Sequence, residues 1–199
     1  MQIVDLSKAI KVLHEGGIIV YPTDTLYALG ADVFNEDAVK KIYETKKRPM
    51  VDPLPVAVSD LAGIEKIAFV DEQTMQLAEC FLPGPLTLVL RKKKSIAGVV
   101  TGGLDKVAVR VPGNEVALEL LSEFGPLTVT SANIHGKKTP YLIKDIKMQF
   151  NVDEVAVYLD HGRLDGLPST IVDMTMDKPS VLREGIITKR EIFDAIRYK

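Results

Sequence analysis

Hydrophobic and polar residues follow helical and strand periods along the chain, with short turns between the periodic segments. Apolar residues at helical spacing over 6–13 predict a helix, Gly16-Gly17 ends it, and the apolar run 18–21 predicts a buried strand. The same criteria predict further helices over 35–46, 60–66, 71–81, 114–121, 143–150 and 188–196, and strands over 54–58, 87–91, 107–111, 127–130, 155–159, 170–174 and 180–183.

Several of these helices begin with residues that cap helix N-termini. Asn35 and Asn114 each precede a helical pattern, where an amide oxygen can accept hydrogen bonds from the first free backbone N–H groups. Thr188 and Glu191 have the spacing of a capping box before the last helix. These residues indicate where the three helices start.

The order of the elements predicts the fold class. Strands and helices are mixed irregularly, which favours an α/β fold with one twisted, open, mixed sheet over a regular βαβ winding. The chain has 199 residues, 46% of them apolar, with no internal repeat and no low-complexity linker. We therefore expect a single domain over 1–199, with the loops gathered at a concave face of the sheet.

Charge and apolar run length exclude several classes of protein. The net charge of −2 gives no overall attraction to nucleic acid or to an anionic membrane, so any tRNA contact must be local. The basic cluster 91–94 is predicted to be a solvated exit from a strand, with RNA contact as the minority interpretation. The N-terminus has no basic region, and no apolar run reaches membrane-spanning length. We expect a cytoplasmic protein that does not bind a membrane.

Cysteine and histidine usage limits the metal and redox chemistry. The single cysteine, Cys80, lies at helical spacing among apolar residues, which predicts a buried and unreactive thiol. The three histidines are scattered and have no cysteine nearby, so a zinc site built from these residues is not expected. Mg²⁺ held mostly by the phosphates of a substrate stays open.

Two polar motifs lie where an apolar-rich element gives way to a loop. Lys46-Lys47-Arg48 carries fixed cations that suit a polyphosphate or a carboxylate, although a solvated helix end would have the same sequence. Ser131-Ala132-Asn133 places a hydroxyl and an amide at alternate positions, which suits neutral hydrogen bonding to a small molecule. Together they suggest a nucleotide site without a P-loop.

Arg110 is a further candidate because it interrupts an apolar strand. A guanidinium there needs an anionic partner or a water-filled cleft, unless this side of the strand faces solvent. Hydroxyl-rich strand ends recur at 23–25, 87, 128–131 and 169–170, and each alone is explained by the strand propensity of threonine. Their recurrence after apolar runs is the informative observation.

Seven ordered blocks of this sequence resemble the YrdC-like family, and the resemblance spans nearly the whole chain. A Lys-x-Arg or Ser-x-Asn motif alone would be weak, whereas the order and spacing of all seven are specific. The blocks are Tyr21-Pro22-Thr23-Asp24-Thr25-Leu26-Tyr27-Ala28-Leu29-Gly30, Lys46-x-Arg48-Pro49 with Asp52-Pro53-Leu54, Pro83-Gly84-Pro85-Leu86-Thr87, Val109-Arg110-Val111-Pro112, Thr130-Ser131-Ala132-Asn133, Pro168-Ser169-Thr170-Ile171-Val172-Asp173 and Leu182-Arg183-Glu184-Gly185.

The resemblance implies a nucleotidyltransferase activity. Known members are threonylcarbamoyl-AMP synthases, which combine L-threonine, bicarbonate and ATP and release pyrophosphate. Their product serves N6-threonylcarbamoyladenosine modification of tRNA by a downstream transferase complex. The resemblance also implies an open α/β fold with a large, concave, positively charged cavity, in the single-domain form of the family.

The resemblance also implies roles for individual residues. L-threonine would lie near Thr23, Arg110, Ser131 and Ser169, with Arg110 holding its carboxylate bidentately. ATP would lie near Lys46, Arg48, Asn133 and Arg183, and Lys46 and Arg48 would stabilise charge in the transition state. Mg²⁺ would come with the ATP phosphates, and no protein ligands to a metal are assigned.

Three departures and two alternatives accompany this hypothesis. Ala28 replaces a usual glycine, Ala57 stands where many members have histidine, and Lys106 occupies a position more often threonine. An RNA-binding module that grips tRNA or double-stranded RNA is one alternative function. A carbamoyl-adenylate-forming relative is the other. Loops 98–103 and the segment after Asn133 are candidates for a lid over the site.

Overall fold

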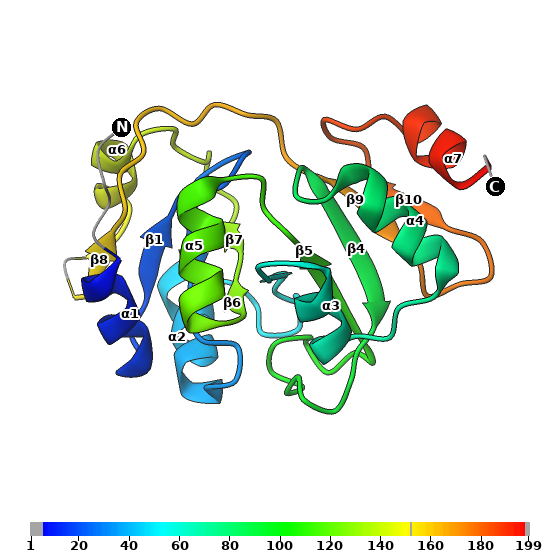
Figure 1. The fold of residues 1–199 in the computed structure, drawn as a ribbon. Coiled ribbons are helices and arrows are strands. Elements are labelled where there is room, and N and C mark those ends of the chain that lie inside the picture. The colour runs from blue at the N-terminus through cyan, green and yellow to red at the C-terminus, as the bar shows by residue number, and fades with distance from the viewer. Residues whose placement is uncertain (1–5, 152, 198–199) are drawn as a thin grey trace.

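The computed structural model describes residues 6–151 and 153–197, and Figure 1 shows how their elements are arranged. The helices are α1 (Ser7–His14), α2 (Glu36–Lys46), α3 (Leu61–Ile67), α4 (Glu72–Phe81), α5 (Glu115–Phe124), α6 (Ile143–Lys147) and α7 (Lys189–Arg197). The strands are β1 (Ile19–Tyr21), β2 (Ala28–Gly30), β3 (Val56–Ala57), β4 (Leu86–Arg91), β5 (Lys106–Arg110), β6 (Leu127–Thr128), β7 (Thr130–Ser131), β8 (Val157–Tyr158), β9 (Thr170–Asp173) and β10 (Ser180–Arg183).

The strands form two mixed sheets, where the sequence predicted one. The four-stranded sheet has the order β7-β2-β1-β8, and the six-stranded sheet has the order β10-β9-β4-β5-β3-β6. The segment 127–130 was expected as one strand, but the structure divides 127–131 into β6 of the larger sheet and β7 of the smaller one. The sheets meet at this segment, through an isolated bridge between Asp32 and Leu127 and a 3.0 Å hydrogen bond from the Thr128 amide to the Ala31 carbonyl. The α/β class with mixed pairing is confirmed.

Strand β2 was not predicted, because it is only three residues long and ends in glycine. The glycine has a packing reason: a Cβ on Gly30 would lie 2.7 Å from a ring carbon of Tyr21 on the paired strand β1. Gly30 therefore lets the β1–β2 pair close tightly beside a buried aromatic ring.

The predicted helix caps are confirmed. The Asn35 side chain accepts hydrogen bonds from the amides of Asp37 and Ala38, and Asn114 accepts one from Ala117. At α7, the Thr188 amide and hydroxyl donate to the Glu191 carboxylate. Helix α6 ends at Lys147, three residues before the predicted boundary.

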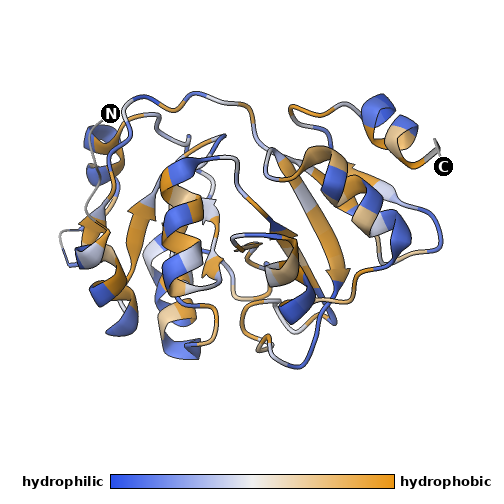
Figure 2. Cartoon of the chain, in the orientation of Figure 1, coloured by the Kyte–Doolittle hydropathy of each residue, from blue (hydrophilic) through white to orange (hydrophobic). Residues whose placement is uncertain are grey.

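Helices cover both faces of the four-stranded sheet, and this explains why β1 is a continuous apolar run. Ile19 and Tyr21 pack into a cluster with residues of α1 and α5, whereas Val20 points into the larger core between the sheets and α2. All three residues are fully buried. Figure 2 shows the strands coloured largely as hydrophobic and the helices as amphipathic.

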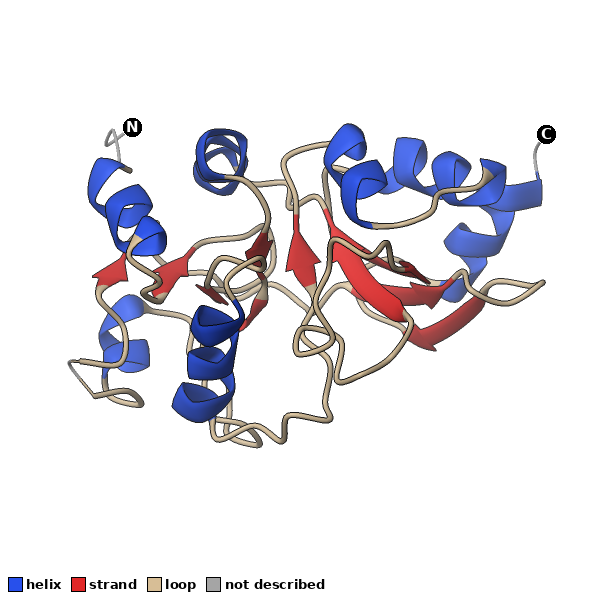
Figure 3. Ribbon diagram, turned by 90° about the horizontal axis from the view of Figure 1, so that it is seen from below, coloured by secondary structure: helices blue, strands red, loops and turns tan. Residues whose placement is uncertain are grey.

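The six-stranded sheet is covered differently. Figure 3 shows helices on one of its faces, among them α4, and loops rather than helices on the other. The helix-free face of this sheet is therefore available for a binding site.

Two further expectations concern the burial of Cys80 and membrane-spanning segments. Cys80 is exposed at the end of α4, so the prediction of a buried thiol was wrong. The helix turns Leu77 and Ala78 toward the core, and Cys80 falls on the other face. Among the described helices, none is both long enough and apolar enough to cross a membrane.

Candidate functional site

A cavity of about 500 Å³ lies on the face of the six-stranded sheet opposite α4, because Leu86, Leu88 and Leu90 of β4 pack in the core with α4 and the alternate residues Thr87 and Val89 line the cavity. Alternate residues of two neighbouring strands form its floor, with Thr87 and Val89 from β4 and Ala108 and Arg110 from β5. Its walls come from segments far apart in the sequence, through Thr23, Thr25, Arg48, Ser131, Pro168, Ser169, Ile171 and Arg183.

The charge of this lining is one-sided. Arg48, Arg110 and Arg183 all line the cavity, and no Asp or Glu is among its described lining residues. A cavity with several guanidinium groups and many hydroxyls suits an anionic ligand that also offers hydrogen-bonding groups. The resemblance predicted such a cavity.

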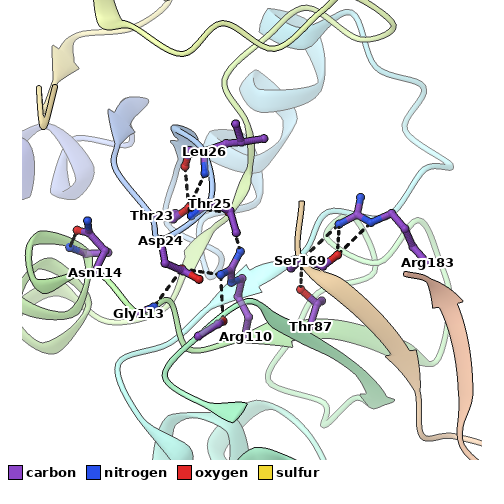
Figure 4. A network of polar contacts seen from close by, with 12 residues as sticks. Thr23, Asp24, Thr25, Leu26, Thr87, Arg110, Gly113, Asn114, Ser169 and Arg183 are labelled. Carbon is purple, nitrogen blue, oxygen red and sulfur yellow. Dashed lines mark hydrogen bonds and ion pairs between the residues drawn. The ribbon is translucent and has the colours of Figure 1, made fainter. Parts of the chain in front are cut away.

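Arg110 is the most buried of the three arginines, with 4% of its surface exposed. Its Nη2 donates to Asp24 Oδ1 at 2.6 Å and to the Gly84 carbonyl at 3.0 Å, and its Nη1 donates to Thr25 Oγ1 at 3.3 Å (Figure 4). Burial lowers the pKa of Arg110, and the charge of Asp24 opposes that effect. The sequence left Arg110 with an anionic partner, a water-filled cleft or a solvent-facing strand, and the structure provides the first two.

Asp24 was not predicted as a site residue. It lies 86 residues before Arg110, in the loop between β1 and β2. Its place in the sequence could have pointed to it. Asp24 is a carboxylate between two threonines, and one of them, Thr23, was an expected site residue.

A second polar group lies on the other side of Arg110. The Arg183 guanidinium donates to the Ser169 carbonyl from Nε at 3.1 Å and from Nη2 at 2.8 Å, and Nη2 also reaches Ser169 Oγ at 3.2 Å. Ser169 Oγ and Thr87 Oγ1 share a hydrogen bond of 2.8 Å. Burial lowers the pKa of Arg183, and the positive charge of Arg110 lowers it further. Figure 4 shows the contacts of Arg183, Ser169 and Thr87 beside those of Arg110, with no dashed line joining the two groups.

Thr23 holds the turn that precedes β2. Its hydroxyl donates to the Leu26 carbonyl at 2.7 Å and accepts from the amides of Thr25 and Leu26, both at 3.2 Å. The Thr23 side chain is therefore a turn-forming group that also lines the cavity.

Lys46 does not line the cavity, although its motif was predicted to face a ligand. Its Nζ is buried behind the wall and donates to the carbonyls of Ser131 at 2.5 Å and Asn133 at 2.7 Å. Burial lowers its pKa to about 7, with a smaller contribution from the charge of Arg48. Lys46 thus joins the end of α2 to the segment that follows β7.

Asn133 also lies behind the cavity wall. Its Nδ2 donates to the carbonyls of Ile134 and Lys137, each at 2.8 Å, and its Oδ1 accepts a 2.5 Å hydrogen bond from Ser131 Oγ. Ser131 itself lines the cavity. The Ser-x-Asn motif therefore forms a braced turn, with only its serine on the surface of the cavity.

Arg48 lies on the cavity wall, because two carbonyls anchor its side chain. Nε donates to Asp52 at 3.2 Å and Nη2 donates to Pro53 at 3.1 Å. Of the eight expected site residues, six line one cavity: Thr23, Arg48, Arg110, Ser131, Ser169 and Arg183.

Comparison with known proteins decides the family. A family model named Sua5_yciO_yrdC, described as telomere recombination, matches residues 11–185. The chain belongs to the Sua5/YciO/YrdC family. It is 41% identical over 184 residues to a threonylcarbamoyl-AMP synthase of Pyrococcus abyssi, covering 90% of this chain and 54% of that protein. It is 38% identical over 178 residues to a putative threonylcarbamoyl-AMP synthase of Methanocaldococcus jannaschii, covering 89% and 84%.

The fold agrees with a solved structure of the same family. The structure of P. abyssi Sua5 complexed with L-threonine superposes with a TM-score of 0.90 at 39% identity, covering 95% of this chain and 56% of that one. This chain therefore spans about half the length of the P. abyssi relative. The sequence resemblance to the YrdC-like family is confirmed.

The three departures from the family pattern have clear positions in the structure. Ala28 lines the cavity, whereas Ala57 is buried in β3, paired in register with Arg110. Lys106 does not line the cavity, because its ammonium pairs with Asp173 at 2.8 Å.

The structure also bears on a protein-bound metal and on the two segments expected as lids, loop 98–103 and the segment after Asn133. Within the residues that the structure describes, no group of three or more His, Cys, Asp or Glu side chains could hold a metal ion. Loop 98–103 packs into the protein, with Thr101 buried and the Val100 carbonyl bonded to the Leu54 amide at 2.8 Å. Thr139, in the segment after Asn133, does line the cavity.

Proposed function

We propose that this protein is an L-threonylcarbamoyl-AMP synthase, a nucleotidyltransferase that converts L-threonine, bicarbonate and ATP into threonylcarbamoyl-AMP and pyrophosphate. One observation carries the proposal: three arginines and the hydroxyls of several distant segments converge on one cavity, and none of its described lining residues carries a carboxylate. A cavity of this kind suits an amino acid carboxylate together with a polyphosphate. The names of the P. abyssi and M. jannaschii relatives, and the threonine bound to the Sua5 neighbour, support it.

The contacts around Arg110 support a threonine end of the cavity. Thr23, Arg110, Ser131 and Ser169 would surround the amino acid, with the guanidinium attracting its carboxylate. The hydroxyls offer donors and acceptors for the amine and the side-chain hydroxyl of threonine. Val89 and Ala108, on the floor between them, provide an apolar surface for its methyl group.

The positions of Arg48 and Arg183 support a phosphate end. Both guanidinium groups are held by carbonyl oxygens rather than by carboxylates, so their charge is not neutralised by a neighbouring anion. We propose Arg48 as the catalytic cation that stabilises charge on the transferred phosphate. Lys46 and Asn133 would act from behind the wall by holding Ser131, because direct contact of the Lys46 ammonium with ATP requires it to leave two carbonyls.

The reaction would proceed in two steps. The threonine amine adds to CO₂ derived from bicarbonate and loses a proton, which gives N-carboxy-threonine. The new carboxylate oxygen then attacks the α-phosphorus of ATP, and the bond to the β-phosphate oxygen breaks to release pyrophosphate. The protein would contribute mainly by orienting the reactants and stabilising charge.

Mg²⁺ would accompany ATP. Since no carboxylate is among the described lining residues, the ion would be held by phosphate oxygens and water, and it would neutralise charge on the departing pyrophosphate. The product would pass to a downstream complex that transfers the threonylcarbamoyl group to tRNA.

The test is to incubate the protein with ATP, bicarbonate and one amino acid at a time, and to measure pyrophosphate and the adenylated carbamate by mass spectrometry. We expect both products with threonine, and neither when bicarbonate is omitted. Activity with serine but not threonine would overturn the substrate assignment. Salt-sensitive RNA binding in a protein with no threonine-dependent use of ATP would favour the RNA-binding alternative.

A further inference from the structure

The ion pair between Asp24 and Arg110 lies at the threonine end of the proposed site. Its N–O distance is 2.6 Å, and only 5% of the Arg110 side chain and 14% of the Asp24 side chain are exposed. Asp24 Oδ1 also accepts a 3.0 Å hydrogen bond from the Gly113 amide, which fixes the carboxylate. Figure 4 shows Asp24 and Gly113 on one side of the guanidinium, and Ser169 and Arg183 on the other.

These contacts determine which N–H groups Arg110 can offer a ligand. A guanidinium binds a carboxylate bidentately through one of two edges, and both edges include Nη2. The two hydrogens of Nη2 are already donated to Asp24 and Gly84, and one hydrogen of Nη1 is donated to Thr25. Nε is buried without a hydrogen-bond partner. The expected bidentate hold on threonine therefore conflicts with the Asp24 contact, and one hydrogen of Nη1 is left for a ligand.

The ion pair between Asp24 and Arg110 also affects how positive charge is distributed among the arginines of the cavity. Arg110 and Arg183 line one cavity, and the pKa of Arg183 is lowered mainly by burial and further by the charge of Arg110. Asp24 compensates Arg110, whereas Arg183 is held by the neutral oxygens of Ser169. Of the three arginines that line the cavity, Arg110 is the one that pairs with a carboxylate in the described structure, so the uncompensated positive charge belongs to Arg48 and Arg183.

We infer that Asp24 is a positioning residue that makes the Arg110 end of the cavity selective for a zwitterionic amino acid over a multiply charged anion. It occupies the bidentate edges of the guanidinium and compensates its charge, so a phosphate gains little by binding there. Asp24 does not line the cavity, and it acts on the ligand only through Arg110. This inference rests on the proposed function.

The test is the substitution Asp24→Asn, which keeps the shape of the side chain and removes its charge. We expect the KM for threonine to rise about tenfold, because a guanidinium that Asp24 no longer fixes presents its free Nη1 hydrogen less well to the amino acid carboxylate, while the KM for ATP changes by less than about twofold. Inorganic phosphate should become a competitive inhibitor against threonine, because the freed guanidinium can bind it. A purely structural role would give neither selective KM change nor competition by phosphate.

Asp173→Asn is the matched control. It removes a carboxylate that pairs with Lys106, and Lys106 lies on β5, the strand that carries Arg110. It should leave the KM for threonine and the effect of phosphate unchanged. If Asp24→Asn does not fold, Asp24→Glu keeps the charge and displaces the guanidinium by one methylene. This variant should raise the KM for threonine without creating phosphate inhibition.

An unchanged KM for threonine in either folded Asp24 variant overturns the inference. So does phosphate inhibition that is equal in Asp24→Asn and the wild-type protein. Failure of the proposed function would look different, because the wild-type protein itself would then release no pyrophosphate with threonine and bicarbonate. Thermal stabilisation of Asp24→Asn by phosphate, measured without any substrate, tests the charge argument independently.

Discussion

The ammonium group of Lys46 lies 2.5 Å from the carbonyl oxygen of Ser131, which joins two motifs that are 85 residues apart in the sequence. The contact links the last turn of α2 to β7, and a second hydrogen bond to Asn133 reinforces it. The two motifs meet behind the cavity wall, and Arg48 is the cation of the first motif that lines the cavity.

This buried contact predicts a dependence of stability on pH. The pKa of Lys46 is lowered from 10.5 to about 7, so between these values the unfolded chain carries a proton that the folded protein lacks. The contribution of Lys46 to the unfolding free energy therefore rises with pH over this window, by at most about 1.4 kcal/mol per pH unit. We expect the stability difference between the wild-type protein and Lys46→Met to grow from pH 7 to 9.5 in urea titrations.

The matched control is Lys41→Met, which removes an exposed lysine from the same helix. A stability difference for Lys46→Met that stays flat over the pH range would contradict the prediction. At pH 7 the methionine variant should already be destabilised by roughly 1–3 kcal/mol, because the Asn133 carbonyl loses its Lys46 donor and the Ser131 carbonyl keeps only the Asn133 amide.

Arg48→Met should weaken the phosphate end of the cavity. Its guanidinium is anchored by the carbonyls of Asp52 and Pro53 at the wall. We expect the KM for ATP to rise by about tenfold or more, with the KM for threonine changed by less than about twofold. Arg91→Met, which removes an exposed cation at the end of β4, is the control. Equal effects of the two substitutions on ATP would argue against the assignment.

Ser169→Ala should affect the threonine end. The substitution removes the hydrogen bond that Ser169 shares with Thr87 and one of the contacts from Arg183, but it leaves both hydrogen bonds to the Ser169 carbonyl. We expect the KM for threonine to rise about tenfold and the unfolding free energy to fall by about 1 kcal/mol. Ser180→Ala, at an exposed position of β10, should change neither quantity. Normal threonine kinetics in Ser169→Ala would remove this residue from the proposed site.

Gly185→Ala should be strongly destabilising. A Cβ at this position would lie 2.0 Å from the Pro168 carbonyl oxygen and 2.7 Å from the carbonyl carbon of Ser169, so backbone atoms must move. We expect a loss of roughly 3 kcal/mol, measured by denaturant unfolding, together with weaker threonine use because Ser169 shifts. Gly98→Ala, whose Cβ would meet nothing within 4 Å, should leave stability unchanged or slightly raised. Similar stability of the two variants would contradict this packing argument.

Much of the fold could be predicted from the sequence, because its signals are local. The helical period of apolar residues, together with Asn35 and Asn114 as caps, located α2 and α5 within a few residues. Helix capping and periodicity depend on neighbours within a few residues along the chain. The missed strand β2 and the division of 127–131 between two sheets depend on pairing with distant strands, which no local pattern encodes.

The sequence by itself limited Arg110 to an anionic partner, a water-filled cleft or a solvent-facing strand, since a guanidinium cannot be buried among apolar residues without compensation. It also identified six residues that line one cavity. Only the tertiary structure decided that the anion is Asp24, 86 residues away, and that Lys46 and Asn133 lie behind the wall. The reason is physical: residue type limits which partners a side chain requires, whereas strand register and loop packing decide which partner it contacts.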